Sequence, residues 1–127
     1  MQGCPFCNII ESNSKDVLRA GLAAAFLDKY PVSTGHTLIV PVRHEADFTL
    51  LTREEHTAMW VLVSEVVESS RAEHHPDGFN IGVNVGEAAG QTVAHAHMHV
   101  VPRYSGDVDD PRGGVRWVVP EKAAYWE

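Results

Sequence analysis

The chain has 127 residues, which suits a single domain able to bury about two-thirds of the surface of its unfolded chain. Hydrophobic residues make up 44% and charged residues 21%, a balance that excludes a largely disordered protein. The formal charge of −7 argues against binding nucleic acid or an anionic membrane through bulk positive charge. Local donors would have to hold any anionic ligand.

The apolar segments are short. The longest, Leu22 to Leu27 and Ala58 to Val63, have six residues each, against the roughly 18 that span a bilayer, so we expect no membrane partner. The start lacks a basic region followed by an apolar one, which predicts a cytoplasmic location. In that reducing compartment, Cys4 and Cys7 suggest a metal knuckle or a redox pair rather than a structural disulfide.

Two apolar segments predict the first strands. They run from Leu22 to Asp28 and from Thr37 to Val42, and the turn-forming residues between them predict a hairpin. Thr52 and Glu55 have the capping-box spacing, so a helix should begin there and run to about Glu73. Its apolar residues recur with helical spacing: Met59, Leu62, Val63, Val66 and Val67.

Two later segments alternate apolar and polar residues, as half-buried strands do. They run from Phe79 to Val85 and from Ala94 to Val101. Because strands and helices do not alternate regularly, we expect an α+β fold with an antiparallel sheet. Residues 1–127 should form one domain, in which residues 104–127 are a glycine-rich tail of unpredicted conformation.

The last predicted strand carries His95, His97 and His99 on one face. Near neutral pH, histidine can serve as nucleophile, acid, base or metal ligand, which makes this face a candidate catalytic site. Two functional hypotheses are open. The three rings bind a catalytic zinc ion together, or His97 attacks an electrophile while its neighbours tune its charge and supply a proton. A solvated polar face is the structural alternative.

A loop punctuated by glycines, Gly86 to Thr92, precedes the histidines. Its backbone donors, with the Gln91 amide and the Thr92 hydroxyl, could surround phosphate oxygens. Such a loop can also be a plain connection between strands. Its direct junction with the histidines favours a phosphoryl substrate over a metal centre.

The spacing of Cys4 and Cys7 is that of one half of a zinc site, which needs two further ligands. The alternative is a pair of free thiols near a mobile terminus.

Together these motifs resemble the histidine triad (HIT) superfamily of nucleotide hydrolases and transferases. The matching residues are Asn84, Gly90 to Val93 and His95 to Val101, preceded by Phe26 to Asp28, Gly35 to Pro41, Arg43 and His44. The resemblance runs from Cys4 to about Arg103. It implies an antiparallel sheet of about five strands with one long helix and a short N-terminal helix, paired as a homodimer. Residues 104–127 would be the family's variable tail.

The resemblance also implies roles for single residues. His97 would attack the α-phosphorus of a nucleotide, and water would resolve the nucleotidyl-histidine without magnesium. His99 would bind the phosphate and assist the leaving group. The other nucleotide-binding residues would be Asp28 at the ribose and Asn84, Gly90, Gln91 and Thr92 at the phosphate. The substrate would be a dinucleoside polyphosphate or a nucleoside phosphoramidate, a choice that the sequence leaves open.

Family branches with an N-terminal Cys-x-x-Cys motif add an upstream histidine and the first triad histidine to complete a zinc site. This implies the ligand set Cys4, Cys7, His44 and His95. The ion would keep His95 unprotonated and place positive charge near His97, which favours the uncharged nucleophile.

The remaining histidines are expected outside the catalytic set. His36 should support the triad or be a satisfied core residue, whereas His56, His74 and His75 should lie on or at the end of the long helix. The tail segment Arg112 to Trp117 would shape leaving-group specificity or form a surface loop. Two other functions stay open: a zinc-dependent metallohydrolase using all three triad histidines, and a nucleotide-binding regulatory partner with weak turnover.

Overall fold

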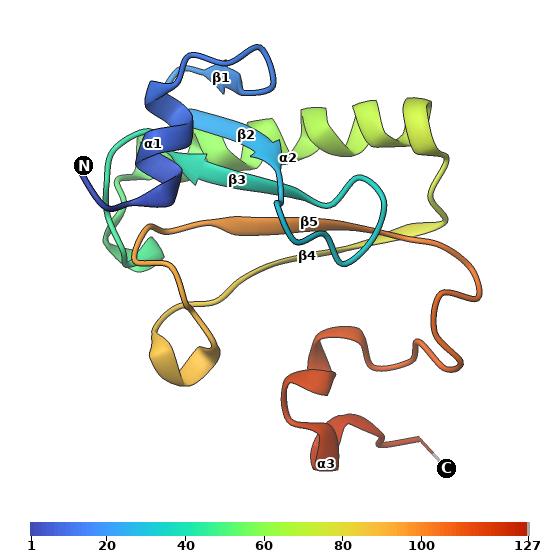
Figure 1. The fold of residues 1–127 in the computed structure, drawn as a ribbon. Coiled ribbons are helices and arrows are strands. Elements are labelled where there is room, and N and C mark those ends of the chain that lie inside the picture. The colour runs from blue at the N-terminus through green and yellow to red at the C-terminus, as the bar shows by residue number, and fades with distance from the viewer. Residues whose placement is uncertain (127) are drawn as a thin grey trace.

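The structure, a computed structural model, describes residues 1–126 and contains a five-stranded antiparallel sheet with helices on both faces (Figure 1). The helices are α1 (Pro5–Glu11), α2 (Arg53–His74) and α3 (Pro120–Ala123). The strands are β1 (Leu18–Ala20), β2 (Ala23–Leu27), β3 (Thr37–Pro41), β4 (Gly78–Val83) and β5 (Met98–Arg103), in the order β1-β2-β3-β5-β4. The predicted α+β fold is confirmed, including the long helix and the short N-terminal helix.

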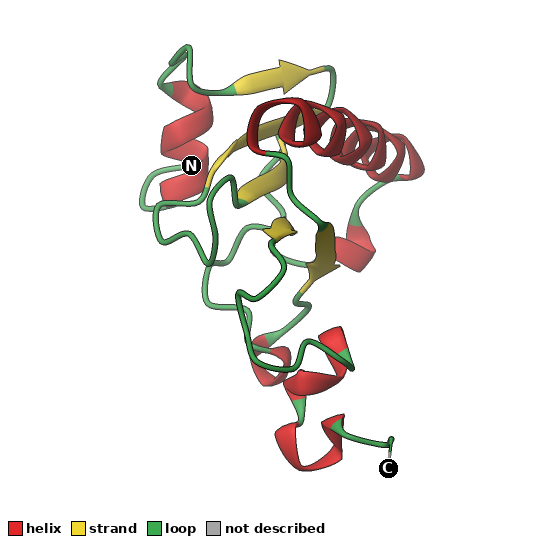
Figure 2. Cartoon of the chain, turned by 90° about the vertical axis from the view of Figure 1, so that its right-hand side faces the viewer, coloured by secondary structure: helices red, strands yellow, loops and turns green. Residues whose placement is uncertain are grey.

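Helices cover both faces of the central strands, which explains why β2 and β3 are apolar apart from Thr37. Ala25 and Ile39 belong to the core on the α2 side, whereas Phe26 and Leu38 pack with Phe6 of α1. Figure 2 shows the sheet between these two helices. None of the helices within residues 1–126 is long and apolar enough to cross a membrane.

The strand that carries the histidines begins later than predicted. β5 covers Met98–Arg103, so the prediction of a strand from Ala94 is wrong at its start, and residues 94–97 form an irregular lead. The backbone gives the reason: the Ala96 N–H donates to the Glu45 carbonyl oxygen at 2.7 Å instead of joining the sheet. The carbonyl group of Glu45, which lies in a loop, therefore determines where β5 begins.

The predicted alternation of side chains nevertheless holds through this lead. Ala96, Met98 and Val100 belong to the core on the α2 side. His97 and His99, which alternate with them, therefore face the α1 side of the sheet. This is the side on which the candidate site is built.

Other boundaries lie close to those predicted. β2 and β3 fall inside the predicted segments and pair as the expected hairpin, while β4 ends at Val83, two residues before the predicted Val85. Within residues 104–126, the tail contains a short 3-10 helix at Gly114–Val118, followed by α3.

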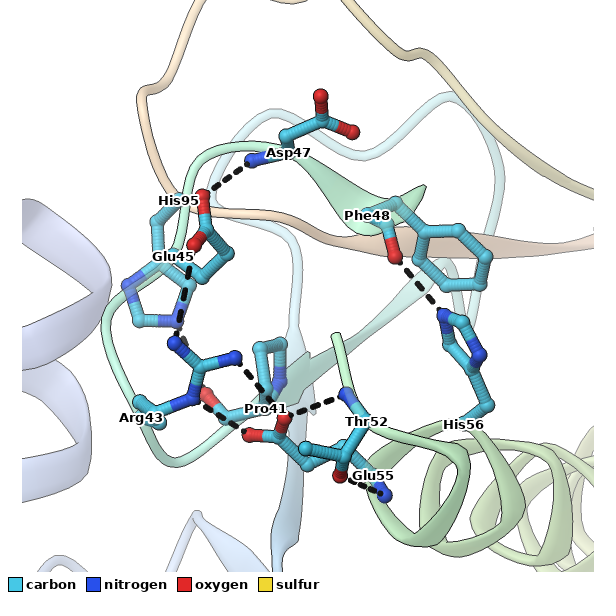
Figure 3. A network of polar contacts seen from close by, with 9 residues as sticks. All are labelled: Pro41, Arg43, Glu45, Asp47, Phe48, Thr52, Glu55, His56 and His95. Carbon is cyan, nitrogen blue, oxygen red and sulfur yellow. Dashed lines mark hydrogen bonds and ion pairs between the residues drawn. The ribbon is translucent and has the colours of Figure 1, made fainter. Parts of the chain in front are cut away.

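The start of α2 is fixed by the predicted capping box and by one arginine that the pattern did not indicate. Thr52 accepts from the Glu55 N–H at 3.0 Å, and Glu55 accepts from the Thr52 N–H at 2.9 Å. Arg43 donates to both carboxylate oxygens of Glu55 at 3.0 and 3.1 Å (Figure 3). The helix ends one residue beyond the predicted Glu73, where His75 adopts a left-handed conformation.

The buried Glu55 carboxylate should contribute to stability in a pH-dependent way. The hydrogen bonds from Arg43 hold its pKa below the ordinary value of 4.5, so this contribution is present above pH 4.5 and is lost as the pH falls below that value. At pH 7, Glu55→Gln should lower the free energy of unfolding by about 1–3 kcal/mol. Urea unfolding at pH 7 and pH 3.5 measures this effect. The exposed Glu54→Gln is the control, and an equal loss in both variants would contradict the account.

Candidate functional site

His97 is 7% exposed and lies immediately before β5. Its Nδ1 is 2.8 Å from the backbone carbonyl oxygen of His95, which can only accept a hydrogen bond. Nδ1 therefore carries the ring hydrogen, and Nε2 keeps a free lone pair. The Phe6 ring packs edge-on against the imidazole, with centroids 5.0 Å apart, and limits its rotation. His97 thus presents a nucleophilic nitrogen in a fixed orientation.

His36 and His99 form a hydrogen-bonded pair beside His97, whose ring centroid is 5.1 Å from that of His99. The Val32 N–H donates to His36 Nδ1 at 3.0 Å, so the ring hydrogen of His36 is on Nε2. His99 Nδ1, 2.9 Å from that atom, must accept it. The hydrogen of His99 is therefore on Nε2, from which it can be donated to an anionic ligand.

The environment of this pair keeps both rings uncharged. Burial lowers the pKa of His36 and of His99 below 6.5, although the Asp28 carboxylate opposes the shift. Asp28 Oδ2 is 3.5 Å from His36 Nε2, and its Oδ1 accepts from the Tyr30 N–H at 2.8 Å. Near pH 7, His36 therefore remains the donor and His99 the acceptor of the hydrogen bond between them. His36 both fills the core, at 2% exposure, and supports the triad.

The side chain of His95 faces a cluster with Cys4, Cys7 and His44, whose donor atoms all lie within 4.8 Å of one another. His95 is fully buried, and its Nε2 donates to the Pro41 carbonyl oxygen at 2.9 Å (Figure 3). Its Nδ1 therefore keeps a lone pair, 3.4 and 3.5 Å from the two sulfur atoms. The structure thus brings all four predicted metal ligands together.

The spacing of these atoms fits a tetrahedral zinc ion. Zinc–sulfur and zinc–nitrogen bonds of about 2.3 and 2.05 Å place sulfur and nitrogen roughly 3.6 Å apart across a tetrahedral angle. The observed separations are 3.4 and 3.5 Å to His95 and 3.3 Å between Cys7 Sγ and His44 Nδ1. With two thiols and two imidazoles, the cluster offers the donor types that structural zinc sites use. Burial raises the pKa of Cys7, so the thiolate form needs a nearby cation.

The three triad histidines do not converge on a common point. Among residues 1–126, the ligand clusters separate His95, with its two cysteines, from His99, with Asp28 and His36, while His97 belongs to neither. This geometry argues against a catalytic zinc ion bound by all three rings. The cluster around His99 is also unsuited to a metal, because a hydrogen already lies between its two imidazoles.

The loop Gly86–Thr92 is braced by Gln91, whose task differs from the one predicted. Gln91 accepts from the Gly86 N–H at 2.9 Å and donates both amide hydrogens, at 2.8 Å to Ala46 O and at 3.0 Å to Val93 O. No hydrogen is left for a phosphate, so Gln91 positions the loop. Within residues 1–126, the N–H groups of Thr92 and Val93 have no protein acceptor and remain available.

Glycine is required at two positions of this loop, since Gly86 and Gly90 have φ values of 89° and 93°. Thr92 is exposed at the end of the loop. Asn84 is half-buried and follows Val83, the partner of Met98, which brings it opposite His97. Asn84 therefore lies at the end of β4 that is nearest the histidines.

The predicted positions of His56, His74 and His75 on or at the end of the long helix are confirmed, and two contributors to the site were missed. His56 bonds to the Phe48 carbonyl oxygen on α2, while His74 and His75 lie at the end of that helix, away from the site. Sequence reasoning did not identify Phe6, although it lies inside the Cys-x-x-Cys motif, or Val32, which acts through its backbone and leaves no side-chain signal.

The comparisons with known proteins agree with this geometry. The HIT domain family model matches residues 10–106. An uncharacterized 16.1 kDa HIT-like protein of Mycoplasma pneumoniae is 42% identical over 80% of this chain and 72% of its own. The AP-4-A phosphorylase of Mycobacterium tuberculosis is 34% identical over 83% of this chain but only 56% of its own.

Among solved structures, a Zn-bound histidine triad family protein from Mycobacterium smegmatis superposes with a TM-score of 0.75 at 36% identity, covering 83% of this chain and 78% of its own. The family match spans most of the chain and includes the histidines that the structure places at the centre of the site. The chain therefore belongs to the HIT family.

Proposed function

We propose that this protein is a nucleotide hydrolase or nucleotidyl transferase that acts at the α-phosphate through a covalent intermediate on His97. The observation that carries the proposal is the hydrogen bond from His97 Nδ1 to the His95 carbonyl, because it leaves Nε2 unprotonated. The relative named AP-4-A phosphorylase supports the substrate class.

In the first step, the lone pair of His97 Nε2 forms a bond to the α-phosphorus. The bond to the leaving group breaks, and the leaving group keeps the electron pair and takes a proton from solvent. The phosphorylated ring is positively charged, and its Nδ1–H stays bonded to the His95 carbonyl, which stabilises that charge. In the second step, the oxygen of a water molecule attacks phosphorus and loses a proton to solvent. The bond between phosphorus and Nε2 breaks, and Nε2 keeps the electron pair. If another nucleophile replaced water, the nucleotidyl group would be transferred to that nucleophile.

The surrounding groups would stabilise charge on the non-bridging oxygens of the transition state. His99 Nε2–H and the free N–H groups of Thr92 and Val93 are donors with fixed positions. Asn84, Gly90 and the Thr92 hydroxyl would complete the phosphate site, which Gln91 positions. The Asp28 carboxylate would accept hydrogen bonds from the ribose hydroxyl groups. No step in this scheme requires magnesium.

Zinc would be held by Cys4, Cys7, His44 and His95, and when bound it would supply a structural cross-link between α1 and the lead into β5. The carbonyl of His95 is also the acceptor that orients His97. By fixing His95, the four metal ligands would thus also fix the position of the His97 ring.

We also propose that two copies pair through β4 as a homodimer. β4 is an edge strand of the sheet, and its Ile81 is 41% exposed. An unpaired edge can continue the sheet into a second copy. Sedimentation equilibrium of the purified chain would show a monomer if this pairing were absent.

His97→Ala should abolish formation of the intermediate. We expect a nucleotidyl adduct on His97 when the wild-type protein reacts with an adenosine phosphoramidate without added magnesium and is quenched by alkaline denaturation, with detection by peptide mass spectrometry at neutral to alkaline pH. The variant should lose the adduct and about 10⁴-fold or more in kcat. His75→Asn, which keeps the left-handed helix end, is the control. Retention of the wild-type rate by His97→Ala would sink the covalent mechanism and favour a binding protein.

Removal of one cysteine should release the metal. Protein purified with zinc should hold about one ion per chain by native mass spectrometry, and Cys7→Ser should hold much less and unfold at a lower temperature. Asn8→Ser, on the exposed side of α1, should match the wild-type protein. Equal zinc content in all three proteins would show that the cluster is not the metal site.

A further inference from the structure

The peptide group between His95 and Ala96 is hydrogen-bonded at both of its polar ends. Its carbonyl oxygen accepts from His97 Nδ1 at 2.8 Å, and its N–H donates to the carbonyl oxygen of Glu45 at 2.7 Å. Because a peptide group is planar and trans, these two bonds leave it on opposite sides, and a rotation of the plane would disturb both. The Glu45 carbonyl therefore helps to fix the acceptor that orients the His97 ring.

The bond to Glu45 also affects the strength of that acceptor. Hydrogen bonds in a chain polarise one another, so an amide that donates through its N–H accepts more strongly through its oxygen. The His95 carbonyl thus holds the hydrogen of His97 on Nδ1 more firmly while the peptide N–H is bonded. Whatever keeps the Glu45 carbonyl in place therefore also matters for the nucleophile.

Glu45 lies in an irregular loop, residues 42–47, which follows β3. Besides Ala96, this loop holds the glycine-punctuated loop, because the Ala46 carbonyl accepts from the Gln91 amide at 2.8 Å. Within residues 1–126, no backbone N–H of residues 43–46 donates to another backbone group. Side chains must therefore hold the loop in its conformation.

Arg43 connects this loop to the long helix (Figure 3). Its Nε and Nη2 donate to the two carboxylate oxygens of Glu55, at 3.1 and 3.0 Å, and its Nη1 is 3.6 Å from Glu45 Oε1. Glu55 is buried in the first turn of α2, so it is a fixed partner. The other carboxylate oxygen of Glu45 accepts from the Asp47 N–H at 3.1 Å. The guanidinium thus spans from α2 to the residue whose carbonyl bonds to Ala96.

The contribution of Arg43 depends on geometry more than on charge. Its side chain is 49% exposed, and water weakens the attraction within such an ion pair. The planar guanidinium, however, donates to both oxygens of Glu55 in a fixed fork while its third nitrogen faces Glu45. A lysine at this position would keep the charge but could not reproduce the three directions.

We propose that Arg43 is a positioning residue for the nucleophile. By holding the loop of residues 42–47 against α2, it keeps the Glu45 carbonyl on the peptide group between His95 and Ala96, and thereby keeps the hydrogen of His97 on Nδ1. The inference rests on the proposed function, in which His97 Nε2 attacks phosphorus. Arg43 itself takes no part in the bonds that form and break.

Three measurements on the full chain test this role with Arg43→Ala. Hydrogen exchange of the Ala96 amide should be faster by about tenfold or more, relative to the amides of β3, which report global unfolding. Long-range ¹H–¹⁵N spectra should show a second population of His97, with the hydrogen on Nε2 or on both nitrogens. With an adenosine phosphoramidate, kcat/KM should fall by about tenfold or more. Arg43→Lys should lie between wild type and Arg43→Ala in all three.

Two control variants separate positioning from loss of stability and loss of charge. Thr52→Ala removes the hydroxyl that caps α2 and should lower the unfolding temperature, but it leaves the contacts between Arg43 and Glu55. Arg53→Ala removes an exposed cation from the start of the same helix. Both should keep the wild-type Ala96 exchange, His97 spectrum and kcat/KM.

The role of Arg43 is overturned if Arg43→Ala keeps the wild-type Ala96 exchange and His97 spectrum, or if Thr52→Ala loses as much kcat/KM as Arg43→Ala. A normal rate of His97 adduct formation in Arg43→Ala also overturns it and leaves the covalent mechanism standing. Absence of the adduct in the wild-type protein would instead defeat the proposed function, and with it the nucleophile that Arg43 is inferred to position.

Discussion

The hydrogen bond between His97 Nδ1 and the His95 carbonyl oxygen is the constraint on which the rest of the site depends. A neutral imidazole has one hydrogen, and a carbonyl can only accept, so this contact decides which nitrogen is free to attack. It also ties the nucleophile to the backbone of its neighbour. Whatever holds His95 in place, here the Pro41 carbonyl and the cysteine cluster, holds the reactive nitrogen.

The same logic orders the other imidazoles, because the ring of His36 and that of His95 each have a backbone partner of fixed polarity, and His36 passes that order on to His99. Val32 N–H determines the tautomer of His36, which determines that of His99, while the Pro41 carbonyl determines that of His95. In the proposed mechanism, the three neighbouring histidines would thereby have three separate tasks: ligand, nucleophile and donor. Burial supports this order by keeping His36 and His99 uncharged.

The sequence predicted the fold and the four residues of the cysteine–histidine cluster that the structure brings together, but it failed where the contact partner is a backbone group. Alternation correctly placed His97 and His99 on one face, and the capping box correctly placed the start of α2. The start of β5 was missed because the Ala96 N–H bonds to a loop carbonyl, and the bracing role of Gln91 depends on two carbonyls that no side chain reveals. The tail lacks periodicity, so its 3-10 helix and α3 could be found only in the folded chain.

The protonation state of His97 is the most direct test of this account. Long-range ¹H–¹⁵N correlation spectra of ¹⁵N-histidine-labelled protein distinguish the two neutral tautomers and the charged ring. Near pH 7 we expect the hydrogen of His97 on Nδ1, and those of His95 and His99 on Nε2. A spectrum that placed the hydrogen of His97 on Nε2, or showed that ring doubly protonated, would contradict the account.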